Sequence, residues 1–290
     1  MRLLIKLRAT ADCEWVTNCH PWIRGRIWDA LSGTEYESMH DTHHPPGFSY
    51  GLPFPWGDVS EGETRHMLIA SPIREIIGEI ASDLDSNPEL KLGTMPFEVV
   101  DMDVVDIDVG GAGSTGTLKT ETGVLCKINS DIARDVYDID TPDGSDEDVF
   151  WRPEHTMEPF RDSITQNLAY KHWLFESPGD LRDDVTVTSD VPNYQSQIVA
   201  DGGEEVTDGD VLTGPIDVDY SLFESWDLQK TYSIPIEVTT KQEQTVVLSK
   251  WEFDYRVQDS HHRRILNLLL DLGIGSRNSL GLGFMNRVSD

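Results

Sequence analysis

The sequence predicts an α+β fold of two tandem ferredoxin-like domains, each with a four-stranded antiparallel sheet and two helices on one face. The order strand, helix, strand, strand, helix, strand runs from residue 2 to 109, and a similar order returns after residue 124. A length of 290 residues also favours two domains over one. We expect the domains to span 1–115 and 116–290.

The N-terminal elements follow from apolar periodicity and from helix-end signals. A helix over 20–32 has Asn18 as its expected cap, Pro21 in its first turn and Gly33 after its end. Its expected buried stripe is Trp22, Ile23, Ile27, Ala30 and Leu31. The other predicted elements of this half are strands over 2–8, 48–56 (irregular), 66–71 and 97–109, and a helix over 72–84.

The second half repeats this order with longer connections. Its predicted elements are strands over 124–128, 232–238, 245–257 and 283–288, and helices over 157–175 and 260–272. A glycine-rich stretch over 110–122 is typical of a linker between the domains. Residues 177–228, rich in Asp, Gly and Pro, are interpreted as an acidic insertion.

The charge is strongly negative, with 52 acidic and 23 basic residues and a net charge of -29. Hydrophobic residues make up 38%, enough for a folded core. Asp outnumbers Glu by 32 to 20, and Lys occurs 8 times, which indicates adaptation to molar salt. At about 1 M salt the Debye length is roughly 3 Å, so this charge does not exclude nucleic acid as a partner. The alternative is an acidic protein-interaction or calcium-binding module.

No membrane-spanning run and no signal peptide are expected, so the sequence indicates a cytoplasmic protein. Cys13, Cys19 and Cys126 have no CxxC spacing, and a disulfide framework is not expected. Cys13, Cys19 and His20 make at most a partial zinc site, and free thiols are the commoner situation. We therefore predict neither a cofactor nor a bound metal.

The most specific motif is a glycine-rich loop over 273–283 that follows an apolar helix. It has the pattern G-x-G-x5-G-x-G, formed by Gly273, Gly275, Gly281 and Gly283, and it contains Arg277 and Ser279. Such a loop lets backbone N–H groups approach phosphate oxygens closely. A plain helix C-cap followed by a turn is the alternative.

This loop resembles the C-terminal signature of the RAMP superfamily of CRISPR-associated proteins. The N-terminal half, with a helix ending in ALSGTEY and a following MHD, is similar to the repeat-cleaving Cas6 family of that superfamily. The resemblance implies a metal-independent endoribonuclease that cuts CRISPR precursor RNA within its repeats. It implies attack by the ribose 2′-OH, leaving a 2′,3′-cyclic phosphate and a 5′-hydroxyl.

Such cleavage needs proton transfer to and from the reacting oxygens, for which histidine is suited. The resemblance places the catalytic histidine after the first helix, where it favours His40 over His43 and His44. Tyr36, four residues earlier, is a candidate hydrogen-bond donor to His40. No lysine lies between Lys6 and Lys91, so the lysine of some family members has no local counterpart.

Basic residues in the nearly neutral ends of the chain are candidate RNA ligands, because guanidinium groups pair well with phosphate. They are Arg24, Arg26, Arg263 and Arg264, beside Arg277 of the loop. A solvated surface is the alternative for each, but arginine persists here while lysine is scarce. The main rival function is a non-catalytic RAMP subunit that binds guide RNA within a multisubunit CRISPR effector complex. If the protein is instead the endoribonuclease, we expect CRISPR precursor RNA and such an effector complex as its partners.

Overall fold

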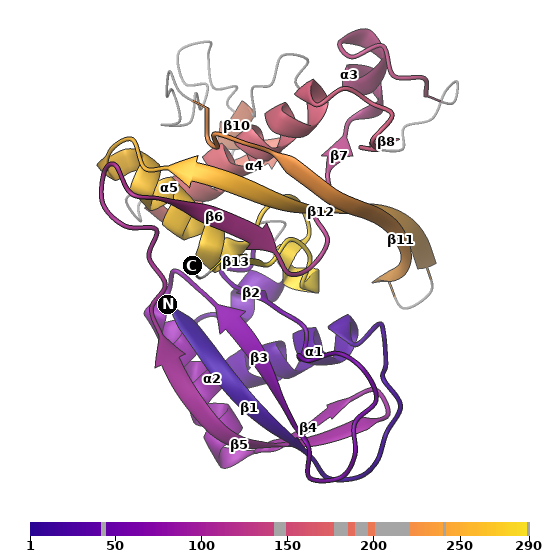
Figure 1. Cartoon of the computed structure of the whole chain (residues 1–290), viewed down its shortest axis with the longest axis vertical. Helices are drawn as coiled ribbons and strands as arrows, with labels where there is room; N and C mark the ends of the chain where they lie inside the picture. The colour runs from indigo at the N-terminus through magenta and orange to yellow at the C-terminus, as the bar shows by residue number, and fades with distance from the viewer. Residues whose placement is uncertain are drawn as a thin grey trace.

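The computed structural model describes residues 1–41, 45–141, 149–176, 185–188, 197–200, 221–239 and 242–288. Two antiparallel sheets with their helices form the lower and upper halves of the molecule (Figure 1). The predicted α+β class with tandem ferredoxin-like folds is confirmed.

The first sheet has the strand order β2-β3-β1-β5-β4. Its strands are β1 (Arg2–Ala9), β2 (Ser49–Tyr50), β3 (Thr64–Ala70), β4 (Glu89–Leu92) and β5 (Met95–Val105). The central strand, β1, buries Leu3, Ile5 and Leu7 and pairs antiparallel with β3 and β5. Strand β4 is an added edge strand that the sequence did not predict, because four residues are too few to show a period.

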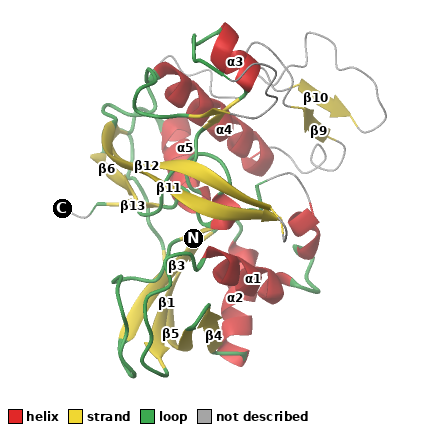
Figure 2. Cartoon of the chain, turned by 90° about the vertical axis from the view of Figure 1, so that its right-hand side faces the viewer, coloured by secondary structure: helices red, strands yellow, loops and turns green. Residues whose placement is uncertain are grey.

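Helices α1 (His20–Leu31) and α2 (Arg74–Ser86) cover one face of this sheet (Figure 2). Two predicted details of α1 are wrong. The N-cap is Cys19, without a side-chain hydrogen bond, and not Asn18. Trp22 is 44% exposed, because its ring lies over the β4–β5 turn, 3.3 Å from the position of a Cβ on Gly93, and not in the core.

The second sheet has the order β11-β12-β6-β13. Its strands are β6 (Thr115–Thr120), β11 (Asp227–Thr239), β12 (Gln242–Arg256) and β13 (Met285–Arg287), and its helices are α4 (Glu158–Glu176) and α5 (Ser260–Leu272). Stacked aromatic rings fill the core between sheet and helices, with Phe160 of α4 at 4.5 Å from Trp251 of β12. Both helices lie where the sequence predicted them.

The first strand of this sheet is not the predicted one. Strand β6 occupies the stretch interpreted as a linker, while residues 124–128 form isolated bridges and the short strand β7 (Lys127–Ile128). Gly116 made β6 resemble a linker, but it lies opposite Tyr255 in the register, and a Cβ there would be 2.7 Å from the Tyr255 hydroxyl. The glycine is therefore a packing requirement of the strand.

Short elements complete the fold. They are α3 (Ser130–Asp135), β8 (Val149–Phe150), β9 (Val185–Thr188) and β10 (Gln197–Ala200). Strands β9 and β10 pair with each other within the predicted acidic insertion. The rest of that insertion, apart from residues 221–228, lies outside the described residues.

The two halves are joined through the start of the chain. The amino group of Met1 lies 3.1 Å from the carboxylate of Asp271. Arg2 is fully buried and donates to the carbonyls of Leu270 (2.5 Å) and Met285 (2.7 Å). Burial lowers the pKa of Arg2 to about 10. Because these contacts tie β1 to α5 and β13, the end of α5 and the following loop are held against the first sheet.

Candidate nucleic-acid interface

The glycine-rich loop begins where α5 ends and contains the short helix η3 (Asn278–Leu280). All four glycines of its motif have positive φ, between +69° and +75°. A Cβ on Gly283 would lie 1.8 Å from the Ile274 carbonyl oxygen, and one on Gly275 2.7 Å from the Leu125 carbonyl oxygen. The glycines are buried and shape the loop by packing against the protein itself. Residues 276, 277, 279 and 280 of the loop are partly exposed.

A buried lysine on α4 fixes this loop through hydrogen bonds. Nζ of Lys171, on α4, donates to the carbonyls of Gly273 (2.9 Å) and Gly275 (3.1 Å) and to Oδ1 of Asn278 (2.6 Å). Asn278 in turn donates to the carbonyls of Ile274 and Leu282. Burial lowers the pKa of Lys171 to about 7. Lys171 was missed from the sequence, because a lysine in an amphipathic helix is usually exposed.

The loop rests on the N-terminal half at Gly281. A Cβ there would lie 2.5 Å from the Tyr50 ring and 2.6 Å from Nδ1 of His20. The Tyr50 hydroxyl donates to the His20 carbonyl at 3.0 Å, and the His20 ring hydrogen-bonds the Leu280 carbonyl. Burial lowers the pKa of His20 to about 4. His20 is therefore a neutral packing residue at this junction.

His40 lies in the 3-10 helix η1 (Glu37–Asp41), which follows α1 after a connection of five residues. Its exposed side chain packs edge-on against Trp28, with ring centroids 4.9 Å apart. Trp28 is eight residues from His20, or about 12 Å along α1 at 1.5 Å per residue. His40 and Gly281 therefore mark opposite ends of α1. His43 and His44 lie outside the described residues.

Tyr36 has acidic surroundings. Its hydroxyl is hydrogen-bonded to Glu35, and Glu75 and Glu79 of α2 lie near it. Burial, followed by these carboxylates, raises the pKa of Tyr36. The structure therefore directs this hydroxyl towards acidic groups, which favour its neutral form.

The five candidate arginines are not one cluster. Arg26 is paired with Asp83 of α2 and donates to the Asn87 carbonyl at 3.1 Å. Arg263 is paired with Asp108 at 2.5 Å. Both it and Arg264 lie in the first turn of α5, about 15 Å along the helix from the loop. The other two candidates, Arg24 and Arg277, lie near the contact between the glycine-rich loop and the N-terminal half. Arg24 lies near Tyr50, and half-exposed Arg277 is in the loop itself.

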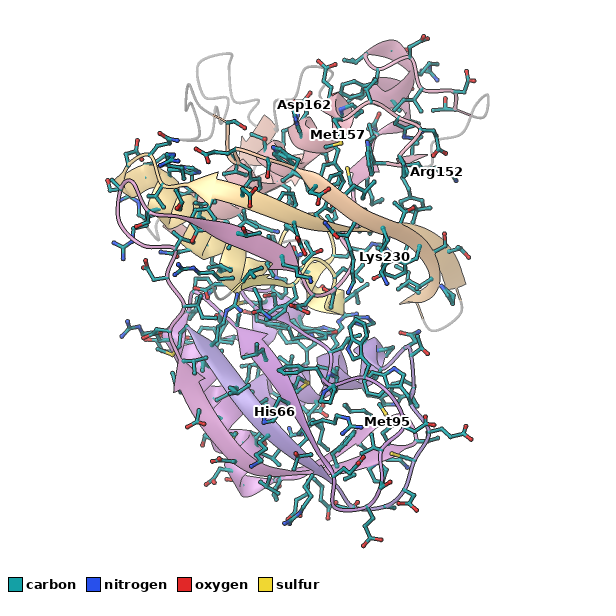
Figure 3. All side chains as sticks on the ribbon, viewed as in Figure 1. His66, Met95, Arg152, Met157, Asp162 and Lys230 are labelled. Carbon is teal, nitrogen blue, oxygen red and sulfur yellow. The ribbon has the colours of Figure 1, made fainter. Side chains whose placement is uncertain are left out.

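A group of three lysines that the sequence did not indicate lies beside this junction, together with the carboxylates of Glu121 and Glu252. Nζ of Lys250, on β12, lies 4.7 Å from the ring centroid of Trp56, which is 54% exposed. Burial lowers the pKa of Lys250, opposed by Glu121. The neighbouring Lys230 and Lys119 lower this pKa further, so three of the eight lysines gather here. In Figure 3, Lys230 lies at the level where the upper half faces the lower half.

The cysteines do not form a metal-binding set in the described part of the chain. Burial raises the pKa of Cys19 to about 11 and that of Cys126 to about 12, which keeps both thiols protonated. Among the described residues, no group of three His, Cys, Asp or Glu side chains is arranged to hold a metal ion.

Two ferredoxin-like folds in tandem, with a glycine-rich loop at their junction, define the class of protein to which this chain belongs. A family model described as "CRISPR associated protein Cas6, C-terminal" matches residues 117–287. A Haloferax mediterranei protein named "CRISPR-associated endoribonuclease Cas6" is 41% identical over 99% of this chain and 94% of its own. The chain belongs to the Cas6 family.

More distant relatives match this chain over nearly its whole length. A Methanocaldococcus jannaschii protein named "CRISPR-associated endoribonuclease Cas6 2" is 23% identical over 99% of this chain and 100% of its own. A solved structure of a Cas6-related protein from Pyrococcus furiosus has a TM-score of 0.64 at 14% identity, covering 100% of this chain and 99% of that one. Another, titled "An RAMP protein binding different RNA substrates", has a TM-score of 0.62 at 15% identity and covers 100% of both chains.

In the described part of the chain, no helix is both long and apolar enough to cross a membrane.

Proposed function

We propose that this protein is a CRISPR endoribonuclease that cuts precursor transcripts within their repeats and so releases mature guide RNAs. The observation that carries the proposal is the 41% identity, over 99% of this chain, to a protein named as a Cas6 endoribonuclease. Arg277 of the loop and the lysines beside the junction support RNA binding, because they supply cations on a chain of net charge -29.

The proposed reaction is an in-line attack of a ribose 2′-OH on the adjacent phosphate, with departure of the 5′-oxygen. The 2′-OH loses a proton and the leaving oxygen gains one, so the products are a 2′,3′-cyclic phosphate and a 5′-hydroxyl. An imidazole is suited to either transfer near neutral pH. We assign one of these transfers to His40, whose ring is exposed and fixed on one side by Trp28.

Tyr36 has less support as a catalytic group. Its hydroxyl faces Glu35, and a second and third carboxylate lie nearby, which disfavours a phosphate at the same place. We propose that Tyr36 acts through packing below η1, where it contacts the core. A Tyr36→Phe variant that keeps full cleavage would support this role, and loss of cleavage would return Tyr36 to the catalytic group.

RNA contact is proposed for the partly exposed residues of the glycine-rich loop. Arg277 has left-handed backbone angles (φ 57°, ψ 39°) and can pair with a phosphate, and Ser279 can donate a hydrogen bond. Gly273, Gly275, Gly281 and Gly283 contribute by giving the loop its shape. Arg24 is the candidate on the α1 side, whereas the ion pairs of Arg26 and Arg263 make them weaker candidates.

The rival function is a guide-RNA-binding subunit that does not cut. In that case His40 is incidental, while loss of Arg277 still reduces binding. We further propose that the protein passes its product to a multisubunit effector complex, that it acts in the cytoplasm, and that its domains are residues 1–115 and 116–290. Strand β5 ends at Val105 and β6 begins at Thr115, so the proposed boundary falls at the start of β6, after the segment that joins the two sheets.

Incubation of the purified protein with a repeat-containing transcript in molar KCl and EDTA tests the proposal. We expect one cut per repeat, and no cut when the nucleotide bearing the attacking 2′-OH is replaced by its deoxy form. His40→Ala should abolish the cut and keep RNA binding. The matched control is His155→Ala, because His155 lies in the other half and accepts a hydrogen bond from the Arg152 backbone. His43→Ala and His44→Ala are tested in parallel.

Binding without cleavage by the wild type would instead favour the rival subunit. Unchanged cleavage by His40→Ala would overturn the assignment of His40 and leave the nuclease activity in place.

A further inference from the structure

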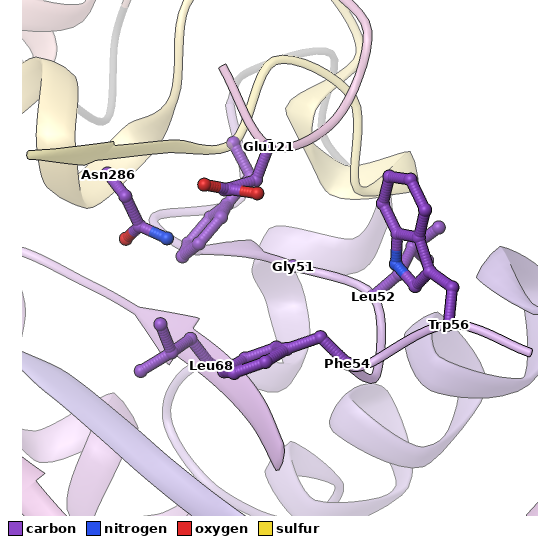
Figure 4. A pocket seen from close by; sticks show the side chains of 8 residues that line it. Gly51, Leu52, Phe54, Trp56, Leu68, Glu121 and Asn286 are labelled. Carbon is purple, nitrogen blue, oxygen red and sulfur yellow. The ribbon is translucent and has the colours of Figure 1, made fainter. Parts of the chain in front are cut away.

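A cavity of about 170 Å³ lies between the two halves, next to the point where the glycine-rich loop meets β2. Its lining residues are Gly51, Leu52, Phe54, Trp56, Leu68, Glu121, Phe284 and Asn286. It adjoins the loop contact because Gly51 follows Tyr50, and a Cβ on Gly51 would lie 3.1 Å from the Phe284 ring. Figure 4 shows the cavity from close by.

The walls of the cavity are aromatic and accessible. Phe54 is 42% exposed and Trp56 is 54% exposed, although both are large apolar side chains. The Phe54 ring is backed by His66, with ring centroids 5.8 Å apart. Trp56 is backed by the ammonium of Lys250. Exposed, backed aromatic rings of this kind are typical platforms for stacking unpaired bases.

Two polar groups lie opposite the Phe54 ring in Figure 4, the Glu121 carboxylate and the Asn286 carboxamide. The Glu121 backbone is held on both sides, since its N–H donates to the Phe284 carbonyl (2.8 Å) and its own carbonyl accepts from Lys250 (2.7 Å). Oδ1 of Asn286 accepts a hydrogen bond from buried Arg2, so its NH₂ group is turned towards the cavity (Figure 4). One wall therefore combines an acceptor carried on a fixed backbone with a donor whose orientation is set by Arg2.

We propose that this cavity binds one unpaired guanine base of the RNA. Guanine has two neighbouring donors, N1–H and the 2-amino group, which fit the two oxygens of the Glu121 carboxylate. Its O6 can accept from Asn286, while its ring stacks on Phe54 or Trp56. Adenine presents an acceptor, N1, where guanine has a donor, and would be repelled by the carboxylate. Lys250 and Lys230 lie where they can neutralise the neighbouring phosphates.

The inference rests on the proposed function, because the base belongs to the RNA substrate. It goes further by naming a base and the residues that select it. The charge on Glu121 is unfavourable for a polyanion and is offset in part by the neighbouring Lys250. Pairing with base donors would offset it further.

The test measures the binding of uridine decamers with one central guanosine, inosine or adenosine. Every nucleotide, including the central one, is in its deoxy form, so that no 2′-OH can react. Inosine lacks the 2-amino group and keeps N1–H. We expect the wild type, in molar KCl, to bind the guanosine decamer about tenfold more tightly than the other two, as for loss of one bidentate base contact. Glu121→Gln should remove this preference without weakening binding of the adenosine decamer. Trp56→Ala should weaken all three.

Matched controls are Glu89→Gln, an exposed carboxylate on edge strand β4, and Trp22→Ala, an exposed tryptophan on α1. Both should bind like the wild type. Equal affinity for the three decamers, no detectable binding of any of them, or a preference kept by Glu121→Gln would overturn the inference. Repeat cleavage is measured on the same preparations: cleavage without guanine preference defeats the cavity assignment alone, whereas absence of both cleavage and repeat binding defeats the proposed function.

Discussion

The ammonium of Lys171 lies 2.6 Å from Oδ1 of Asn278, 107 residues further along the chain, and is buried with it under the glycine-rich loop. Its two other hydrogen bonds end on carbonyls of the same loop. The loop is therefore shaped from below by a side chain outside the motif. Its conformation depends on α4 as much as on the glycines.

Replacement of Lys171 tests this dependence. Lys171→Met keeps the length and volume of the side chain but leaves three buried acceptors without a donor. We expect a loss of unfolding free energy on the order of 3 kcal/mol, measured by chemical denaturation in molar KCl, and weaker RNA binding. Lys127→Met, on the short strand β7, is the control. If Lys171→Met binds RNA as the wild type does, Lys171 does not position the loop.

The contact between Gly281 and Tyr50 gives a second prediction. Gly281→Ala forces a Cβ to 2.5 Å from the Tyr50 ring at a φ of +72°, and we expect a loss of about 2 kcal/mol or more. Gly25→Ala is the matched control, because Gly25 lies in α1 with no atom within 4 Å of an added Cβ. It should gain about 0.5 to 1 kcal/mol. Equal melting temperatures for the two variants would contradict the role of this junction.

Acid should weaken the same junction through His20. Burial lowers the pKa of His20 to about 4, against 6.5 for the ordinary group. Between these values the unfolded chain binds a proton that the folded protein does not, so stability falls as the pH drops from about 6.5 to about 4. The full effect is on the order of 3 kcal/mol. His20→Gln removes it and leaves the carboxylates unchanged.

The measurement is chemical denaturation of both proteins at pH 7 and pH 4.5. The wild type should lose more stability between the two than His20→Gln does. Parallel losses would show that His20 takes up its proton without cost in the folded state.

Salt should stabilise this protein. A net charge of -29 repels itself over about 8 Å at 0.15 M salt but only about 3 Å at 1 M. We expect the melting temperature to rise by at least about 10 °C between 0.15 and 2 M KCl, with sucrose of equal osmolality as the control for general solute exclusion. A melting temperature that is flat in KCl, or that rises equally in sucrose, would contradict adaptation by charge.

The elements that the sequence predicted well are those whose signal is local. Helix α5 has the predicted bounds, 260–272, because its apolar residues repeat with the helical period and Asp259 caps its start. The predicted Asn18 cap of α1 and the predicted burial of Trp22 were wrong, because contacts with neighbouring elements decide both features. The sequence predicted a linker where β6 lies, because β6 pairs with β12 and Gly116 lies opposite Tyr255, far along the chain.

For the site, the sequence by itself determined the candidate residues. They are the glycines of the loop pattern, Arg277, and a histidine after the first helix. The glycines were expected to approach phosphate, but the tertiary structure shows Gly281 packed against His20 and Tyr50, and Gly275 against Leu125. Only the fold brings Lys171 under the loop and Lys250 onto Trp56. The physical reason is that periodicity and turn chemistry act over a few residues, whereas these contacts depend on how two sheets are packed, which no local pattern encodes.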